Sequence, residues 1–478
     1  MNVARLVHPG FWFDKTPLQD ALDLAKRGVG GFCLYGGTRK QVAAFTAAVR
    51  AVSPLDYLLI SADYEDGLGR WLPDAPLLPS NMALGAADDE NLAFEKGLIT
   101  ARQARSLGVD WVFAPVLDLA NNPLNPIVNT RSFGVDPESV IRLARAFIKG
   151  LAQGGALNSI KHFPGHGDTT TDSHVALPVL QRSEKEIFER ELVPFQNLLP
   201  FADSVMLGHL LLPQIDPENP ASLSPAIAKN ILRQQLNYKG CVLTDALLMK
   251  AIGDEKEAAW RALQTGVNIL LVPQNPGDLI DFLEKKKVPA TILARSEKQQ
   301  NILCDKARQA GPRPTQKDAF SKSDYVWRTA RQAIVLLGTL PALTPGQTVH
   351  YLEIGSDGKT SAAPLYNALK KAGICLAPFT GRKADCLLVV CLRRYKAFRG
   401  SVALEQEDEL RLQTALQNCR TSVAVLLASP WALPQKAHTH GTLFTFSPAP
   451  EFQETAAEIL LGNQTANGKL PICIDGII

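Results

Sequence analysis

The sequence predicts an α/β protein, in which a TIM-type (β/α)8 barrel is followed by a smaller α/β sandwich domain. Over about the first 300 residues, short apolar runs alternate with amphipathic segments, which is typical of parallel βα units. Polar, proline-containing sequence then interrupts this pattern before it resumes. A chain of 478 residues also exceeds what one hydrophobic core usually serves, so we expect two domains.

The barrel strands are predicted from apolar runs and the helices from the amphipathic segments between them. Seven strands are expected at residues 31–35, 57–63, 111–118, 159–163, 204–211, 241–245 and 268–272, and an eighth near 3–7. Helices are expected at residues 90–107, 137–152, 184–197, 225–236 and 255–265. Ser183 and Glu186 have the spacing of a capping box for the third of these helices.

Polar residues occur where the predicted strands end. They are Asp63, Asp118, Lys161, His162, His209 and Asp245. In a barrel the carboxyl ends of all strands share one face, where active sites are built. An open doubly wound sheet also gathers functional groups at strand ends, but it does not enclose so many contributors. The placement therefore favours a barrel.

The domain limits follow from the polar, proline-containing sequence that interrupts the βα pattern. We expect a catalytic barrel over residues 1–304, a linker over 305–324 and a C-terminal sandwich over 325–478. Strands of the second domain are expected near residues 333–337, 351–354, 386–392, 423–428 and 443–446, and helices at 362–371, 408–418 and 452–461. This half contains few clustered titratable groups.

The composition of the chain limits the classes of partner that the protein can bind. The formal net charge is only +3, and no basic block with interleaved aromatic residues occurs, so we expect no nucleic-acid partner. No stretch is apolar for about 18 residues and no secretory leader is evident, which predicts a cytoplasmic protein with no membrane contact. The eight cysteines show no CxxC spacing, and we expect buried, reduced thiols.

One segment is unusually rich in groups that exchange protons or bind metals. Residues 161–174 read Lys-His-Phe-Pro-Gly-His-Gly-Asp-Thr-Thr-Thr-Asp-Ser-His and hold three of the eight histidines. Pro164 and two glycines exclude a regular helix or a central strand, so the segment is predicted to be a loop. A loop this dense in His and Asp indicates catalysis or metal binding.

Several ordered motifs resemble glycoside hydrolase family 3, and within it the bacterial β-N-acetylglucosaminidases. The motifs are Phe-Ala-Pro-Val-Leu-Asp at 113–118, Arg-Ser-Phe-Gly at 131–134, the histidine-rich loop at 161–174, Pro-Ala-Ser-Leu-Ser at 220–224 and Thr-Asp-Ala-Leu-Leu-Met at 244–249. The resemblance covers nearly the whole barrel. The second domain resembles the C-terminal sandwich of the family only loosely, most clearly in Gly-Lys-Leu-Pro at 468–471.

The resemblance implies the catalytic groups. By position alone, Asp245 is a carboxylate at a strand end. It either attacks or stabilises a developing cation, or it caps a helix or forms a structural ion pair. In the family, the matching aspartate is the nucleophile of a retaining glycosidase. Asp172 and His174 match an Asp-His pair that serves the family's N-acetylglucosaminidases as the general acid and base. The Gly- and Thr-rich residues before them would let this loop close over a substrate.

The resemblance also implies the residues that bind the sugar. Asp63, Arg131, Lys161 and His162 match sugar-binding positions, and Asp118 and His209 are expected on the same face. The family commonly has Gln-Glu-Gly-Gly-Arg after the first aspartate. Residues 64–70 read Tyr-Glu-Asp-Gly-Leu-Gly-Arg instead, so Arg70 is the candidate for the family's arginine, displaced in register.

The sequence therefore predicts a retaining, exo-acting β-N-acetylhexosaminidase that releases terminal N-acetylglucosamine, with cell-wall muropeptides as the expected substrates. Family 3 β-glucosidase and N-acetylglucosaminide phosphorylase are the alternatives closest in chemistry. A metal-dependent barrel hydrolase using the histidine-rich loop, and a sugar-binding protein without turnover, are the alternatives from other classes. We expect a monomer that acts on a small carbohydrate with neither cofactor nor metal.

Overall fold

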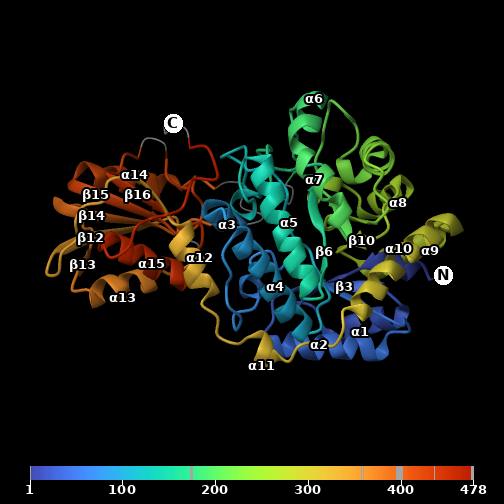
Figure 1. Ribbon diagram of the computed structural model, residues 1–478. Coiled ribbons are helices and arrows are strands. Elements are labelled where there is room, and N and C mark those ends of the chain that lie inside the picture. The colour runs from blue at the N-terminus through green and yellow to red at the C-terminus, as the bar shows by residue number, and fades with distance from the viewer. Residues whose placement is uncertain are drawn as a thin grey trace. The chain divides into compact units, whose positions relative to one another are not determined.

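The computed structural model describes residues 2–172, 176–356, 358, 360–394, 402–434 and 437–474. The chain forms two compact units (Figure 1). The first unit comprises Met1–Leu78, Ala93–Leu119 and Val140–Lys322. The second comprises Pro79–Leu92, Ala120–Ser139 and Ser323–Ile478. Two short internal segments of the chain thus belong to the same unit as its C-terminal part.

The first unit is a barrel of parallel strands. Its strands are β1 (Val7–His8), β2 (Gly10–Trp12), β3 (Gly31–Tyr35), β4 (Leu59–Ala62), β5 (Trp111–Val112), β6 (Leu157–Asn158), β7 (Ile160–Phe163), β8 (Ser204–Leu207), β9 (Cys241–Thr244) and β10 (Leu270–Leu271). Pro9 alone separates β1 from β2, and Ser159 alone separates β6 from β7. Each of these pairs is one interrupted barrel strand, so the ten segments found among the described residues make eight strands.

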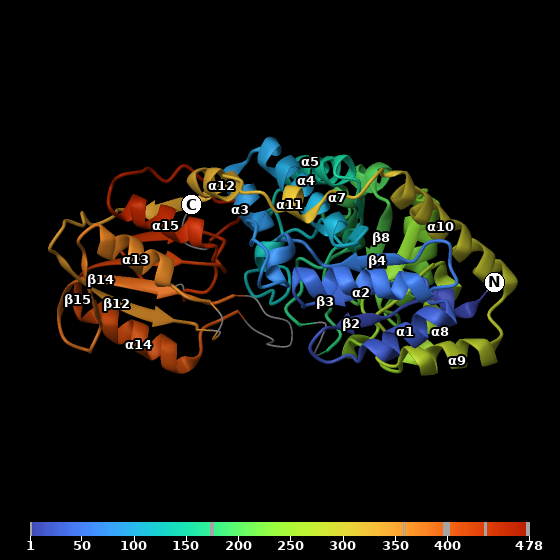
Figure 2. The same cartoon turned by 90° about the horizontal axis from the view of Figure 1, so that it is seen from below.

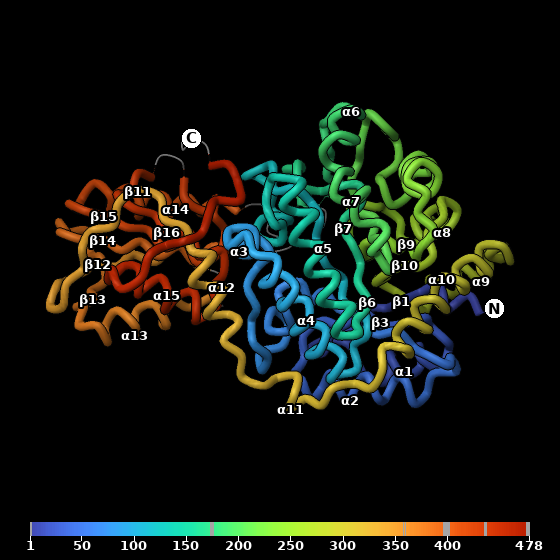
Figure 3. The backbone as a smooth tube through the Cα atoms, in the orientation of Figure 1, coloured from blue at the N-terminus to red at the C-terminus, as the bar shows by residue number. Residues whose placement is uncertain are grey.

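The first and last strands close the barrel. Val7 pairs with Leu270 and His8 with Leu271, both in parallel register, although β1 and β10 are far apart in the sequence (Figure 3). A parallel bridge from Leu243 to Ile269 joins β9 to β10. Closure gives every strand two neighbours and brings all carboxyl ends to one end of the barrel.

Helices follow the strands in βα order. They are α1 (Leu18–Arg27), α2 (Arg39–Val52), α4 (Glu90–Ser106), α5 (Pro137–Gln153), α6 (Glu184–Glu186), α7 (Val193–Leu198), α8 (Glu255–Thr265), α9 (Pro276–Lys286) and α10 (Ala290–Gln309), with π-helices η4 (Ile187–Glu191) and η7 (Ala226–Gln235). Ser183 and Glu186 form the predicted capping box at the start of α6. Among the described residues, no helix has the length and apolar character needed to cross a bilayer.

Apolar side chains from many strands fill the barrel interior. The cluster comprises Cys33, Leu59, Trp111, Phe113, Leu157, Met206, Cys241, Leu243, Ile269, Leu271, Val272, Leu303, Cys304 and Ala307. Residues two apart on a strand point to the same side, so Tyr35 after Cys33, Asp63 two residues beyond Ser61, and Asp245 after Leu243 also face the interior. The core therefore sets the direction of the polar groups at the strand ends.

Several elements differ from their predicted limits. The expected strand near residues 3–7 is a 3-10 helix, η1 (Val3–Leu6), and pairing starts only at Val7. Strand β5 ends at Val112, well before the expected residue 118, and Pro115 nearby has no N–H to donate to a ladder. Helix α10 continues to Gln309 and places Ala307 in the barrel core, and a short helix, α11 (Gln316–Ala319), lies in the expected linker.

The second unit is an α/β sandwich built on one six-stranded sheet. The strands are β11 (Val335–Gly338), β12 (Thr348–Ile354), β13 (Cys375–Pro378), β14 (Ala384–Cys391), β15 (Cys419–Leu426) and β16 (Gly441–Phe444), in the order β11-β16-β15-β14-β12-β13. Only β11 runs antiparallel to its neighbour. The predicted fold class, a (β/α)8 barrel and a smaller α/β sandwich, is confirmed.

Helices cover both faces of this sheet. Helix α14 (Gln406–Gln417) lies on one face, and α13 (Ala363–Lys371) and α15 (Pro450–Leu460) lie on the other (Figures 1 and 2). Helix α12 (Tyr325–Ala333) packs on α15 and on α3 (Asn81–Ala87), which comes from one of the two internal segments. The sequence did not predict α12, β13 or this use of α3.

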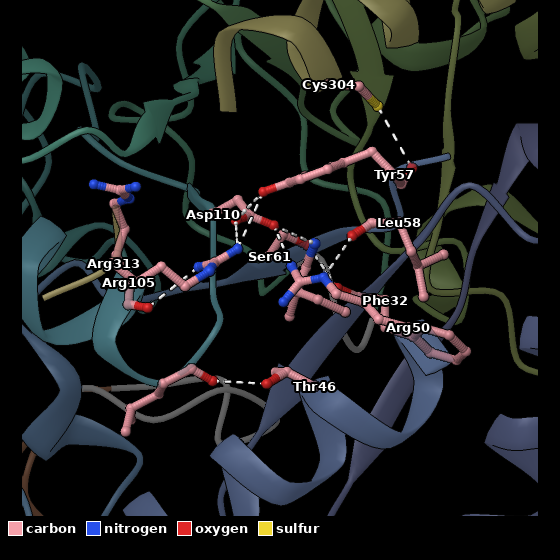
Figure 4. A network of polar contacts seen from close by, with 12 residues as sticks. Phe32, Thr46, Arg50, Tyr57, Leu58, Ser61, Arg105, Asp110, Cys304 and Arg313 are labelled. Atoms are coloured by element: carbon pink, nitrogen blue, oxygen red, sulfur yellow. Dashed lines mark hydrogen bonds and ion pairs between the residues drawn. The ribbon is translucent and has the colours of Figure 1, made fainter. Parts of the chain in front are cut away.

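A polar network lies at the amino end of the barrel strands (Figure 4). The buried Asp110, directly before β5, accepts hydrogen bonds from Arg50 Nη2 at 2.5 Å, Arg313 Nη2 at 2.5 Å and the Tyr57 hydroxyl at 2.8 Å. Arg313 follows α10, so the network ties the end of the first unit to α2 and to the start of β4 and β5. Polar groups at this end of a barrel serve stability.

We expect Asp110→Ala to lower the free energy of unfolding by about 2–3 kcal/mol, because two guanidinium groups lose their shared carboxylate in a partly buried site. Urea-induced unfolding followed by circular dichroism measures the loss. Asp23→Ala is the matched control, since Asp23 is exposed and pairs only with the nearby Lys26 and Gln19. Equal effects of the two substitutions would contradict the role assigned to Asp110.

Candidate active site

Lys161 is a buried cation that holds two carboxylates at the carboxyl end of the barrel. Its Nζ lies 2.7 Å from Asp63 Oδ1 and 2.6 Å from Glu65 Oε1. Lys161 is in β7, whereas Asp63 directly follows β4. A buried ammonium is stable only when it is paired and hydrogen-bonded, which both carboxylates provide. Asp63 keeps its side chain 25% exposed, so the network reaches the surface of the site.

Asp118 orients His162. Asp118 Oδ2 lies 2.6 Å from His162 Nδ1, and Oδ1 accepts hydrogen bonds from the backbone N–H groups of His162 and His166 at 3.1 Å and 2.8 Å. Burial alone would raise the pKa of the Asp118 carboxyl, but His162, His166 and these donors outweigh it and lower the pKa. The carboxylate therefore fixes the proton on Nδ1 and directs Nε2 to other partners.

The histidine-rich loop contains a buried histidine directly after the turn at Gly165. His166 Nδ1 lies 2.9 Å from the Thr169 hydroxyl, and burial lowers the pKa of His166 to about 4. Its imidazole is neutral near pH 7 and is suited to shaping the loop. Gly165 has φ +127°, and a side chain there would contact Glu191. The glycine lets the loop turn tightly over η4.

An ion pair joins the loop to the segment that follows it. Arg182 Nε donates to Asp168 Oδ2 at 2.5 Å, and Arg182 Nη1 donates to Glu186 Oε1 at 3.1 Å. Asp172 is buried, and its carbonyl accepts a hydrogen bond from Ala176 N at 3.0 Å. His174 lies outside the described residues. The pairing of Asp172 with His174 therefore stays a prediction.

Asp245 directly follows β9. Its backbone N–H donates to Leu207 O at 2.9 Å, and its Oδ1 accepts from Ala246 N at 2.7 Å. Around the ring of eight strands, β4 and β9 are on opposite sides, so Asp63 and Asp245 approach the axis from opposite directions. Burial first, and then Cys33, Asp63 and Asp245, raise the pKa of Tyr35 well above its usual value.

His209 supports the backbone beside Asp245. Its Nε2 lies 3.2 Å from Ala246 O, and its Nδ1 lies 2.7 Å from the Ser222 hydroxyl. Because a carbonyl only accepts, Nε2 carries the proton and Nδ1 accepts from the serine. Both ring nitrogens thus have protein partners, and His209 is completely buried. The arrangement favours a positioning role over the predicted contact with the sugar.

Arg70 and Arg131 have partners close to them in the sequence. Arg70 Nη1 lies 3.5 Å from Asp66 Oδ2, and the buried Lys96 lies 3.4 Å from Asp66 Oδ1. Asp66 is one of the residues that depart from the family pattern, and these two cations balance its charge. Arg131 ends the 3-10 helix η3 (Asn129–Arg131) of the second unit and donates to Ile127 O at 3.4 Å. Their contacts with a sugar stay predictions.

Residues 3–302 match the glycosyl hydrolase family 3 N-terminal domain. The chain belongs to glycoside hydrolase family 3. The match covers more than half of the 478 residues and includes all strands of the barrel. The resemblance seen in the sequence is confirmed, and the protein is a glycosidase.

Three proteins of known name or structure are similar to this family 3 enzyme. A β-hexosaminidase from Psychromonas ingrahamii is 33% identical over 275 residues, which are 55% of this chain and 81% of the relative. A family 3 β-N-acetylglucosaminidase from Paenibacillus sp. str. FPU-7 is 26% identical, with a TM-score of 0.85 over 100% of this chain and 99% of that chain. The β-glucoside phosphorylase BglX shares the fold at 22% identity, with a TM-score of 0.89 over 98% of this chain and 93% of that chain.

Sequence reasoning missed Glu65, Tyr35 and Glu191 in this family 3 enzyme. Glu65 lies in the segment that departs from the family pattern and gives no signal of its own in the sequence, yet it binds Lys161. Tyr35 is the last residue of a predicted strand, where its ring gives no functional signal. Glu191 lies in η4, and burial, followed by the charge of Asp168, raises the pKa of its carboxyl to about 7.

We expect Glu191→Gln to raise the thermal stability only slightly at pH 5 and much more at pH 8. The folded pKa of about 7 lies above the ordinary value of 4.5, so the folded state retains a proton that the unfolded state loses between these values. The stability contributed by this proton is complete below pH 4.5 and is lost as the pH rises through about 7. Glutamine resembles the protonated acid at every pH.

Calorimetric melting temperatures at pH 5 and pH 8 test this expectation. Glu189→Gln is the matched control, because Glu189 is in the same π-helix but is exposed and pairs only loosely with Lys185, at 3.9 Å. A gain for Glu191→Gln of the same size at both pH values would show that Glu191 is ionised in the folded protein throughout.

Proposed function

We propose that this glycosidase is a retaining, exo-acting β-N-acetylhexosaminidase that releases terminal β-linked N-acetylglucosamine. The observation that carries the proposal is the position of Asp245, which follows β9 on the opposite side of the barrel from Asp63 and its partner Lys161. A nucleophilic carboxylate facing a charged, hydrogen-bonding network suits attack on a sugar whose hydroxyls need partners. The family 3 relatives named for hexosaminidase activity support the same substrate.

In the proposed first step, the Asp245 carboxylate attacks the anomeric carbon. The bond between that carbon and the leaving oxygen breaks at the same time. The leaving oxygen takes a proton from the His174 imidazolium, and a glycosyl ester of Asp245 forms. In the second step, neutral His174 takes a proton from water as the water oxygen attacks the same carbon. The ester bond breaks and Asp245 returns as a carboxylate. Two inversions give net retention.

The remaining residues have supporting roles in this proposal. Asp63, Lys161 and His162 bind sugar hydroxyls, and Arg131 and Arg70 are further candidates for substrate contacts. Asp118 acts through His162, and His209 acts through the Ala246 backbone. Asp172 accepts a hydrogen bond from His174 and raises its basicity. Muropeptides processed in the cytoplasm stay the expected natural substrates, and chitin oligosaccharides are the alternative source.

Asp245→Ala should lower kcat for an aryl N-acetyl-β-glucosaminide by about 10³-fold or more, because the covalent route is lost. Release of the aryl group, measured by absorbance, gives the rate. Azide should restore part of it, since this small anion fits the space left by the carboxylate. Rates like those of the unchanged enzyme would exclude Asp245 as the nucleophile. A parallel assay with an aryl β-glucoside distinguishes a β-glucosidase.

His174→Ala should lower kcat less for a leaving group of low pKa than for an alkyl leaving group. An acidic leaving group departs without protonation, so it depends little on a general acid. The ratio of kcat/KM for 2,4-dinitrophenyl and methyl N-acetyl-β-glucosaminides measures the difference. Equal losses for both substrates would assign another role to His174.

Phosphorolysis is a second candidate at the same site. Its support is that the proposed acid and base is a histidine, which is neutral after proton donation and does not repel an incoming phosphate as a carboxylate would. Products formed with and without phosphate distinguish the two reactions. Free N-acetylglucosamine in the presence of phosphate supports hydrolysis, whereas the sugar 1-phosphate as main product would replace the proposed function by that of a phosphorylase.

A further inference from the structure

The segment that carries Arg131 is packed into the second unit on both sides of this residue. Residues 125–130 and 132–134 are buried, whereas Arg131 between them is partly exposed. The whole segment belongs to the same unit as the C-terminal sheet. The arginine side chain therefore extends from a backbone that the second unit encloses, and the contacts of that backbone limit where the guanidinium can lie.

Asn129 joins this segment to the sheet. Its Nδ2 donates a hydrogen bond to the Ser429 hydroxyl at 3.0 Å, and its Oδ1 accepts from the Thr130 N–H at 2.9 Å. Ser429 follows the end of β15 at Leu426, and both bonded side chains are buried. Asn129 has φ +40°, a left-handed conformation that asparagine tolerates better than most residues. One side chain thus links the sheet to the residue directly before Arg131.

Two further hydrogen bonds fix the backbone around Arg131. Asn81 of α3 donates from Nδ2 to Arg131 O at 2.7 Å, and the Val135 N–H donates to Pro471 O at 2.9 Å. Asn81 and Pro471 belong to the second unit, as Arg131 does. The backbone is therefore held before and after the arginine, and the bond to Ser429 comes from the end of a sheet strand.

We propose that Ser429 is a positioning residue, which acts through Asn129 to hold Arg131 where this arginine contacts the substrate. The proposal rests on the proposed function, in which Arg131 is a candidate for a substrate contact. A guanidinium recognises an oxygen acceptor in a narrow range of directions, because its donors form a rigid planar fork. The C-terminal part of the chain then contributes to sugar binding, although it holds none of the proposed catalytic groups.

Loss of the Ser429 hydroxyl changes the arginine segment in a defined way. Ser429→Ala leaves the buried Asn129 amide without its acceptor, and an unpaired donor is costly in a buried site. The Asn129 side chain then turns to another partner and releases the Thr130 N–H. The left-handed conformation at Asn129 is no longer held, so Arg131 loses its fixed direction. Substrate binding is weakened, whereas bond cleavage in the bound substrate is not.

Ser429→Ala should raise KM for an aryl N-acetyl-β-glucosaminide about tenfold and change kcat less than about twofold, because it removes binding and not chemistry. Ser429→Thr keeps the hydroxyl and should recover most of the affinity. Ser447→Ala is the matched control, because Ser447 is a buried serine of the same unit whose hydroxyl accepts from Ala449 N at 3.3 Å, at the start of α15. A rise in KM of equal size in the control would overturn the proposal.

A double-mutant cycle tests whether Ser429 acts through Arg131. Arg131→Ala alone should raise KM at least as much as Ser429→Ala does. Adding Ser429→Ala to Arg131→Ala should raise KM no further, because the residue that Ser429 positions is already gone. Increases in KM that multiply in the double variant would overturn the proposal, and so would an unchanged KM in either single variant.

Hydrogen exchange separates this proposal from the proposed function, because it reports on the backbone without turnover. Ser429→Ala should speed exchange in a peptide over residues 125–135 about tenfold, and Ser447→Ala should not. If this difference is found but the unchanged enzyme cleaves no N-acetyl-β-glucosaminide, the proposed function fails and the hold of Ser429 on the segment stands. If cleavage occurs and Ser429→Ala changes neither exchange nor KM, the positioning role is excluded and the function stands.

Discussion

Closure of the parallel barrel is the constraint on which the site depends. The pairing of β1 with β10 turns a series of βα units into a ring, so residues between 63 and 245 meet although they are far apart in the chain. A parallel ring also has direction, because every strand delivers its last residue to the same end. Asp63, Lys161 and Asp245 converge for this reason. An open sheet with the same strands would spread them along an edge.

The charged side chains at the two ends of the barrel differ in how completely they are paired. At the amino end, Asp110 is saturated by Arg50, Arg313 and Tyr57. At the carboxyl end, Lys161 is buried between Asp63 and Glu65, and part of Asp63 stays exposed. A saturated acceptor has nothing left to offer a ligand, whereas a partly exposed carboxylate with a fixed partner can take up a sugar hydroxyl without rearrangement. The same types of residue thus give stability at one end and recognition at the other.

Except for β5 and β8, which end earlier than expected, the sequence predicted the strand ends well, because hydrophobic runs mark strands and the first polar residue after a run marks its end. It predicted neither the second partner of Lys161 nor the packing of Trp71 against Tyr35, since an aromatic residue beside an apolar run has the same pattern whether it fills a core or lies partly exposed. The role of His209 depended on Ser222 and on a backbone carbonyl, neither of which has a sequence signal. The histidine-rich loop was recognised from composition, yet Arg182, which fixes it, lies beyond the motif.

The two internal segments of the second unit have a consequence for synthesis of the chain. Residues 79–92 and 120–139 leave the ribosome well before residues 323–478, which complete their unit. Gly85 and Gly134 show how close this late packing is, because a Cβ atom at either position would lie 3.1 Å from Pro471 Cβ. The nascent barrel must therefore carry two unfinished pieces of its neighbour, and no single cut in the gene yields either unit intact.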